Sequence, residues 1–278
     1  MASKAARMPF LISVPHGGLE VPPKFRSLCK LDLPAILGDG DTWSIFLYSL
    51  ENRVHSYQRF RYARAVLDLN RAPGDRPPQN PDGVVKTVTV SGEQVWKNAG
   101  GLEDEDINYL LENYYHPYHQ SLAEASEPGG IMLGLDCHTM LPEAPGYSTG
   151  DGEKRPLVCL SNRGDYNGEE AGEPLTAPPA LIRSLAEALE KRLALQAERT
   201  NLPAVLINQP FRGGYITRKH GSAGKIPWIQ VEFNRCLYLQ GDPFTAEPDS
   251  ETLSKLNELR SIFIEALKEI SSKQDPTT

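Results

Sequence analysis

Six short apolar runs, separated by helical patterns, constrain the fold of this chain more than any other feature of the sequence. They cover residues 10–14, 65–69, 131–135, 157–160, 204–207 and 229–233. Several lack the apolar–polar alternation of a strand with one wet face, which indicates strands buried on both faces of a sheet. We therefore predict an α/β fold with a central mixed β-sheet flanked by helices.

Helical periodicity predicts helices over residues 42–52, 103–122, 179–198 and 251–270. In the second of these, apolar and aromatic side chains recur at three- and four-residue spacing behind an acidic start, and Pro117 predicts a kink. Residues 72–83 and 164–179 are rich in Gly and Pro, so we expect two long surface loops, of a kind that often serves as a lid.

The length of 278 residues is large for one domain, but α/β enzymes reach it around a single sheet. With 40% hydrophobic residues the chain can bury a large core. We expect one domain over residues 1–278, with its folded core at about 9–270.

Charge and cysteine usage exclude several kinds of partner. The excess of acidic residues, 36 against 29 basic ones, argues against nucleic acid or an anionic membrane as the main partner. An anionic substrate would then depend on local arginines.

The four cysteines form no CxxC pair, which suits a reducing compartment. No apolar run approaches the roughly 20 residues of a membrane helix, and the initial one is too short for a signal peptide. We expect a cytoplasmic protein.

Uncommon polar residues follow three of the predicted strands. They are His16, the pair Asn70 and Arg71, and His138. In open α/β sheets ligands bind in the crevice beyond the carboxyl ends of the strands, so these side chains could meet in one site. Glu232 lies inside the apolar run 229–233, where an unpaired carboxylate is unfavourable and usually has a partner or a raised pKa.

Taken singly, these residues also have ordinary interpretations as turn or salt-bridge residues. His116 and His119 have a spacing that can chelate a metal, but we favour a packed aromatic helix face for them. Cys137 adjoins His138 in a predicted strand and so faces the opposite side, which predicts a core position.

Read together, six motifs in this order resemble the N-formylglutamate amidohydrolase family. They are SVPHGG (13–18), DGDTW (39–43), RAVLDLNR (64–71), DCHTM (136–140), NQPFRGGYIT (208–217) and QVEFNRCLY (230–238). They span most of the chain, so their joint specificity is high. The resemblance implies a zinc-carboxypeptidase-like fold, with one Zn²⁺ bound through His16 and His138 and with Glu232 as the general base.

The resemblance does not settle the third metal ligand. The carboxypeptidase spacing would put a Glu at residue 19, which is Leu here. We prefer Asp41, with Glu20 or Asp39 as alternatives. His and carboxylate ligands suit zinc without excluding iron, cobalt or manganese.

The remaining roles concern substrate. By resemblance, Asn70 and Arg71 act in catalysis beside Glu232. The residues that we expect to bind substrate are Arg64, Arg212, Tyr215 and Arg218.

The implied reaction cleaves the formyl-amide bond of N-formyl-L-glutamate to formate and L-glutamate, a step of histidine catabolism. The alternatives are a hydrolase of another N-acyl amino acid or small peptide, and a catalytically silent carboxylate-binding protein. The expected partner is thus a small anionic N-acyl amino acid, bound by a monomer or small homo-oligomer.

Overall fold

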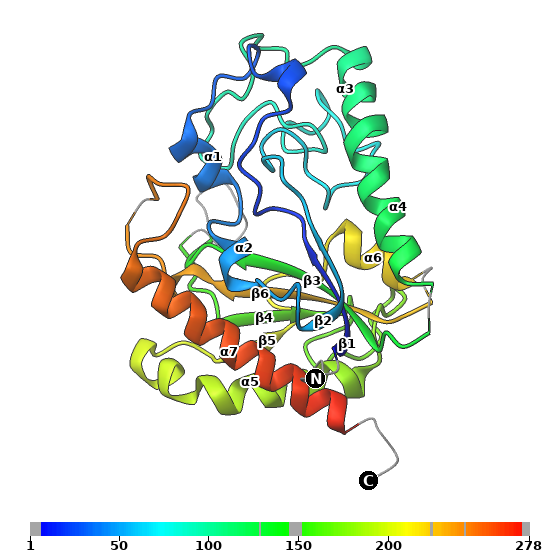
Figure 1. Ribbon diagram of the computed structural model, residues 1–278, viewed down its shortest axis with the longest axis vertical. Coiled ribbons are helices and arrows are strands. Elements are labelled where there is room, and N and C mark those ends of the chain that lie inside the picture. The colour runs from blue at the N-terminus through cyan, green and yellow to red at the C-terminus, as the bar shows by residue number, and fades with distance from the viewer. Residues whose placement is uncertain (1–6, 128, 145–151, 223–224, 242, 274–278) are drawn as a thin grey trace, which may run out of the picture.

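A six-stranded sheet runs through the molecule in the computed structural model, which describes residues 7–127, 129–144, 152–222, 225–241 and 243–273 (Figure 1). Its order is β2-β1-β3-β6-β4-β5. β1 is parallel to β2 and β3, β3 is parallel to β6, and β4 is antiparallel to β6 but parallel to β5. The sheet is therefore mixed, as the sequence predicts. The strands are β1 (Met8–Val14), β2 (Val54–Arg59), β3 (Leu133–Met140), β4 (Val158–Ser161), β5 (Val205–Ile207) and β6 (Trp228–Asn234).

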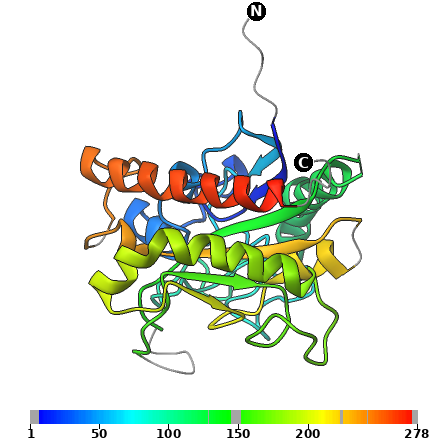
Figure 2. The ribbon, with the colours of Figure 1, turned by 90° about the horizontal axis from the view of Figure 1, so that it is seen from below.

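Helices cover both faces of this sheet. The two longest, α5 and α7, pack against each other and run along one face (Figures 1 and 2). α4 and α6 contact strands on the other side. The helices are α1 (Leu33–Asp39), α2 (Ser44–Leu47), α3 (Asp104–Leu110), α4 (His116–Ala125), α5 (Pro179–Thr200), α6 (Tyr215–Ser222) and α7 (Ser250–Ser272), with a π-helical turn at Leu111–Tyr115 and 3₁₀ turns at Pro23–Phe25 and Arg235–Leu237.

Alternation along the central strands separates a core face from a site face. In β6, Ile229, Val231 and Phe233 belong to the core formed with α5 and α7, so Gln230 and Glu232 point to the opposite side. The same core takes alternate residues of β1 and β3, namely Phe10, Ile12, Val14, Leu133, Leu135 and Cys137. The core position of Cys137 is confirmed.

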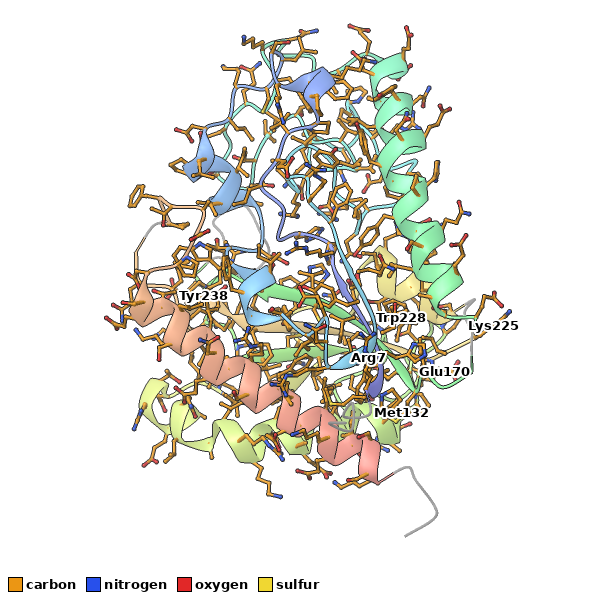
Figure 3. All side chains as sticks on the ribbon, in the orientation of Figure 1. Arg7, Met132, Glu170, Lys225, Trp228 and Tyr238 are labelled. Carbon is orange, nitrogen blue, oxygen red and sulfur yellow. The ribbon has the colours of Figure 1, made fainter. Side chains whose placement is uncertain are left out.

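A second core lies on the other side of the sheet, beneath α3, α4 and α6. Trp228 belongs to it, and a Cβ on Gly134 would lie 2.3 Å from the Trp228 ring, so β3 needs glycine there. Figure 3 labels Trp228 at the start of β6 and Tyr238 beyond its end. The Tyr238 hydroxyl donates to the carbonyl oxygen of Thr42 at 2.8 Å, which ties the segment before α2 to this end of the sheet.

One predicted strand is wrong. Residues 65–69 are almost wholly buried but run through turns without pairing, and the strand in this part of the chain is β2 at Val54–Arg59. β2 pairs only with β1 at the edge of the sheet and is half exposed, so its sequence lacks an apolar run. Apolar runs report burial rather than strand pairing, which explains the error.

The helix predictions are largely confirmed, with different bounds. The predicted helix 42–52 is only α2, Ser44–Leu47. The helix predicted at 103–122 extends to Ala125 and contains a π-helical turn immediately before Pro117, where a wider turn accommodates the missing N–H group. Residues 72–83 and 164–178 have no helix or strand, as expected for loops. Across the described ranges, no helix is both long and apolar enough to cross a membrane.

Candidate active site

His16 leaves the end of β1 in a tight turn made possible by glycine. A Cβ on Gly17 would lie 2.5 Å from Cγ2 of Ile45, and one on Gly18 would lie 2.3 Å from the Arg61 backbone. The turn therefore packs directly against its neighbours. The backbone N–H of Asp41 donates to the His16 carbonyl oxygen at 2.9 Å, which brings a carboxylate beside the imidazole.

Three side chains could hold a metal ion at this point. One ligand atom each from His16, Asp41 and His138 can be chosen so that all lie within 4.8 Å of one another, and all three residues are buried. Asp41 Oδ2 lies 3.0 Å from His138 Nδ1 and 3.7 Å from His16 Nδ1. This spacing fits three ligands around one cation.

The outer nitrogen of each imidazole faces a second carboxylate. His16 Nε2 lies 2.9 Å from Asp68 Oδ1, and His138 Nε2 lies 3.1 Å from Asp136 Oδ2. Such carboxylates fix the orientation of a metal-binding imidazole and raise its basicity as a ligand. Both Nδ1 atoms are thereby left to face Asp41.

The electrostatics of the cluster keep Asp41 ionised. Burial opposes ionisation, but the hydrogen bond from His138 and the charges of His138, His16 and Arg235 lower the pKa of Asp41 to about 2. Arg235 is buried, donates to the Gly40 carbonyl oxygen at 2.5 Å and lies 3.5 Å from Asp41 Oδ1. Arg235 therefore lies on the Oδ1 side of Asp41, while Oδ2 faces the imidazoles.

The two imidazoles differ in their titration. Burial lowers the pKa of His16, although Asp68 opposes this shift. Burial lowers the pKa of His138, but the charge and hydrogen bond of Asp136, the hydrogen bond of Asp41 and the charge of Glu232 outweigh it, so this pKa is raised well above its usual value. The carboxylates therefore favour positive charge at the centre of the cluster.

Glu232 stands next to His138 on the neighbouring strand, since the two residues are register partners in β6 and β3. It is only 8% exposed, and burial raises the pKa of its carboxyl to about 7. The Gln230 side-chain amide donates to Glu232 Oε1 at 2.9 Å and accepts from the Gly214 N–H at 2.7 Å. A buried carboxyl with this pKa suits proton transfer near neutral pH.

A cavity of about 430 Å³ opens onto the cluster and contains most of the arginines that the sequence selects. Arg64 is fixed inside its wall, since Nε donates to Asp68 Oδ2 at 3.0 Å and Nη1 donates to the Asp39 carbonyl oxygen at 2.9 Å. Arg212 also lines the cavity and donates to two backbone carbonyl oxygens of the segment 163–164. Arg71 is more exposed than Arg64, with 37% of its side chain accessible against 16%.

Asn70 lines the cavity but is tied to the surrounding structure. Its Oδ1 accepts from the Ile216 N–H at 2.7 Å, and its Nδ2 lies 3.3 Å from His138 Nε2. Tyr215 and Arg218, by contrast, are not among the residues that line this cavity. Tyr215 packs against His119 with ring centroids 5.6 Å apart, and the Arg218 guanidinium lies 5.7 Å from the Tyr215 ring. Their substrate roles stay predictions.

The alternative third ligands lie elsewhere. Glu20 pairs with Arg61 on the surface at 2.6 Å, with 44% of its side chain exposed. Asp39 is buried and pairs with Lys86 at 2.8 Å, away from both imidazoles of the cluster. The geometry therefore favours Asp41.

Several residues of the site escaped the sequence prediction. Asp136 and Gln230 stand two positions before His138 and Glu232, so each shares a strand face with a residue that was selected. That spacing was an available signal. Arg235 had none, because its partners Gly40, Asp41 and Thr139 all lie far away in the chain.

His119 and His220 form a buried pair outside the candidate metal cluster. Their rings stack with centroids 5.3 Å apart, and His119 Nδ1 lies 3.0 Å from His220 Nε2. His119 also contacts the Leu69 carbonyl oxygen and packs on Tyr215. This environment matches the packed aromatic face that the sequence favoured over a metal site.

This pair should make the protein sensitive to acid. Burial lowers the pKa of His119 to about 3 and of His220 to about 4. The unfolded chain, with a histidine pKa of about 6.5, therefore takes up more protons, so stability is full above about pH 6.5 and falls below it. Each histidine contributes about 1.4 kcal/mol per pH unit in that range. In urea unfolding, the free energy of unfolding of His220→Gln should fall less between pH 7 and pH 5 than that of the wild type. His55→Gln, at an exposed position, is the control, and an unchanged loss in His220→Gln would contradict the prediction.

Fold and site together define an α/β protein in which a buried His–Asp–His cluster, able to hold a metal ion, lies beside a buried carboxyl group. A match to the family described as N-formylglutamate amidohydrolase covers residues 8–239. The chain belongs to the N-formylglutamate amidohydrolase family, which confirms the resemblance seen in its motifs.

Two curated relatives agree with this placement. The chain is 30% identical over 252 residues to N-formylglutamate deformylase of Pseudomonas putida, covering 87% of this chain and 86% of the relative. It is 26% identical over 259 residues to the deformylase of the same name from Pseudomonas aeruginosa, covering 90% and 89%.

Two solved structures share the fold. The crystal structure of N-formylglutamate amidohydrolase from Ralstonia eutropha superposes with a TM-score of 0.71 at 19% identity and covers 97% of this chain and 96% of that one. A gene product of Agrobacterium tumefaciens gives a TM-score of 0.62 at 16% identity, covering 96% and 92%. At these identities the likeness supports the α/β architecture alone.

Proposed function

We propose that this protein is a zinc-dependent hydrolase that cleaves the formyl-amide bond of N-formyl-L-glutamate to formate and L-glutamate. The observation that carries the proposal is the convergence of His16, Asp41 and His138 beside the buried carboxyl of Glu232. The names of the two Pseudomonas relatives support the substrate.

The donor set suits zinc. Two imidazole nitrogens and one carboxylate oxygen form a three-ligand set of the kind found in catalytic zinc sites. When bound, the zinc ion would act as a Lewis acid that polarises the amide carbonyl and lowers the pKa of water. Asp68 and Asp136 orient the two imidazoles, and Arg235 holds Asp41.

The protein's own groups account for proton transfer and binding. Glu232 takes a proton from the attacking water and gives it to the departing nitrogen, and Gln230 keeps its carboxyl in place. Amide hydrolysis requires both transfers. Arg71 and Arg64 provide positive charge at the wall of the cavity for a substrate carboxylate or for the developing oxyanion.

The scattered cysteines, all free, favour a reducing compartment, and we propose a cytoplasmic enzyme acting on a small anionic substrate. Another short N-acyl amino acid on the same site is the second candidate. The cavity of about 430 Å³ would admit one, and its size alone does not select the formyl group.

The test combines metal analysis with formate release from N-formyl-L-glutamate, with and without a chelator. Stoichiometric zinc and chelator-sensitive formate release are expected. Zinc without formate release would redirect the assignment to other N-acyl amino acids. A protein that binds no metal on reconstitution would overturn the mechanism.

A further inference from the structure

Arg71 already holds a carboxylate that comes from the protein itself. Its Nη2 donates to Asp82 Oδ2 at 2.6 Å, and both residues line the cavity. Asp82 belongs to the irregular loop that the sequence predicted at residues 72–83. A small acid bound by Arg71 would meet this carboxylate at the same guanidinium.

Two of the other arginines that line the cavity are less available than Arg71. Arg64 is fixed by Asp68 and by a backbone carbonyl, with 16% of its side chain exposed. Arg235 is 5% exposed, and its guanidinium already donates to the Gly40 carbonyl oxygen next to Asp41. Arg71, with 37% of its side chain exposed, is therefore better placed for a bidentate contact with an incoming carboxylate.

Arg71 is also linked to the candidate metal cluster. Its Nε lies 3.9 Å from Asp68 Oδ2, and Asp68 in turn contacts His16 at 2.9 Å. In an N-acyl amino acid only the α-carbon separates the α-carboxylate from the nitrogen of the scissile amide. A carboxylate on Arg71 thus suits a substrate whose amide reaches the cluster.

The Asp82 contact can be exchanged without leaving a buried charge unpaired. Asp82 has 41% of its side chain exposed, and ion pairs at such sites contribute little to stability. Asp82 Oδ1 also lies 2.7 Å from Nζ of Lys86. The buried Lys86 keeps Asp39 as its partner at 2.8 Å. Asp82 can therefore turn to solvent while Lys86 stays paired.

We propose that Asp82 is a specificity-determining residue whose carboxylate competes with a carboxylate of the substrate for the same position on Arg71. The inference rests on the proposed function for the identity of that substrate. An entering carboxylate displaces Asp82 and balances the positive charge of Arg71 in its place. A neutral ligand cannot balance that charge. A neutral ligand therefore leaves Asp82 in place, and Asp82 weakens the binding of acidic ligands, which compete with it for Arg71.

The experiment measures binding of glutarate, a dicarboxylate without a scissile amide, by calorimetry to the metal-loaded protein. Asp82→Asn should bind glutarate about 10-fold more tightly, equivalent to about 1.4 kcal/mol. It should also lower KM for N-formyl-L-glutamate with little change in kcat. Glutaramide, the neutral diamide, should gain no comparable affinity. Asp82→Ser, which is too short to reach Arg71, should repeat the result and replaces the Asn variant if that one fails to fold.

Asp75→Asn is the matched control. Asp75 lies on the same loop and accepts from the Asn80 side chain at 2.8 Å, but it does not line the cavity. An equal gain in this variant would point to a loosened loop and overturn the proposal, as would unchanged or weaker glutarate binding in the Asp82 variants. Because glutarate is not hydrolysed, the binding result stands apart from turnover. Absence of formate release in every variant would reject the proposed function while leaving the Asp82 test valid.

Discussion

Replacing Glu232 with Gln should lower kcat for N-formyl-L-glutamate by about 100-fold or more while zinc stays bound. The amide cannot accept a proton from water, but it has almost the same shape as the carboxyl and can still accept the hydrogen bond from Gln230. Glu232 is not one of the three candidate metal ligands, so metal content should not change. Steady-state kinetics with metal analysis on the same preparation measure both effects.

The control for Glu232→Gln is the same isosteric change at Glu265. This residue lies on α7, is paired with Lys268 at 2.7 Å, and has 56% of its side chain exposed. Its substitution should leave kcat within about twofold, as surface changes usually have small effects. If Glu232→Gln keeps near-normal turnover, the proton acceptor is another group. If it loses zinc, Glu232 belongs to the metal site instead.

His138→Ala should abolish stoichiometric zinc binding, and activity with it. Loss of a group that only orients a metal ligand typically weakens metal binding by 10–100-fold, so loss of the ligand itself should weaken it by at least roughly 100-fold. Zinc affinity is measured by competition with a chromogenic chelator, which does not depend on turnover. Circular dichroism checks that the variant folds.

Asp136→Asn provides a graded comparison for His138→Ala. It removes the charge 3.1 Å from His138 Nε2 but leaves all three candidate ligands in place. We expect about 10–100-fold weaker zinc binding, between the wild type and His138→Ala. His55→Gln, on the surface, should bind zinc normally. Full zinc stoichiometry at unchanged affinity in His138→Ala would show that the metal site lies elsewhere.

Much of the site follows from strand periodicity, which the sequence carries directly. Side chains two positions apart share a face, so a polar residue within an apolar run points away from the core that its neighbours build. This reasoning predicted that Cys137 lies in the core and that His138 faces the other side, where the structure also has Glu232. It would also have found Asp136 and Gln230.

Local pattern could not separate burial from pairing. Residues 65–69 are as apolar as a central strand, but they pack as turns against the second core. β2 was missed because an edge strand is half exposed and needs no apolar run. The difference depends on which backbone groups find partners across the sheet, and those partners lie elsewhere in the chain.

The sequence by itself determined the α/β class, the family motifs, the selection of His16 and His138, and the buried carboxyl of Glu232. Only the tertiary structure showed that Asp41 lies beside the two imidazoles and that Arg64 and Arg71 are already paired with carboxylates of the protein. Asp41 reaches the imidazoles because its N–H bonds to the His16 carbonyl, and Arg71 is held by Asp82 from a separate loop. The physical reason is that hydrogen bonds and ion pairs between distant segments act over a few ångströms in space. No spacing along the chain encodes them.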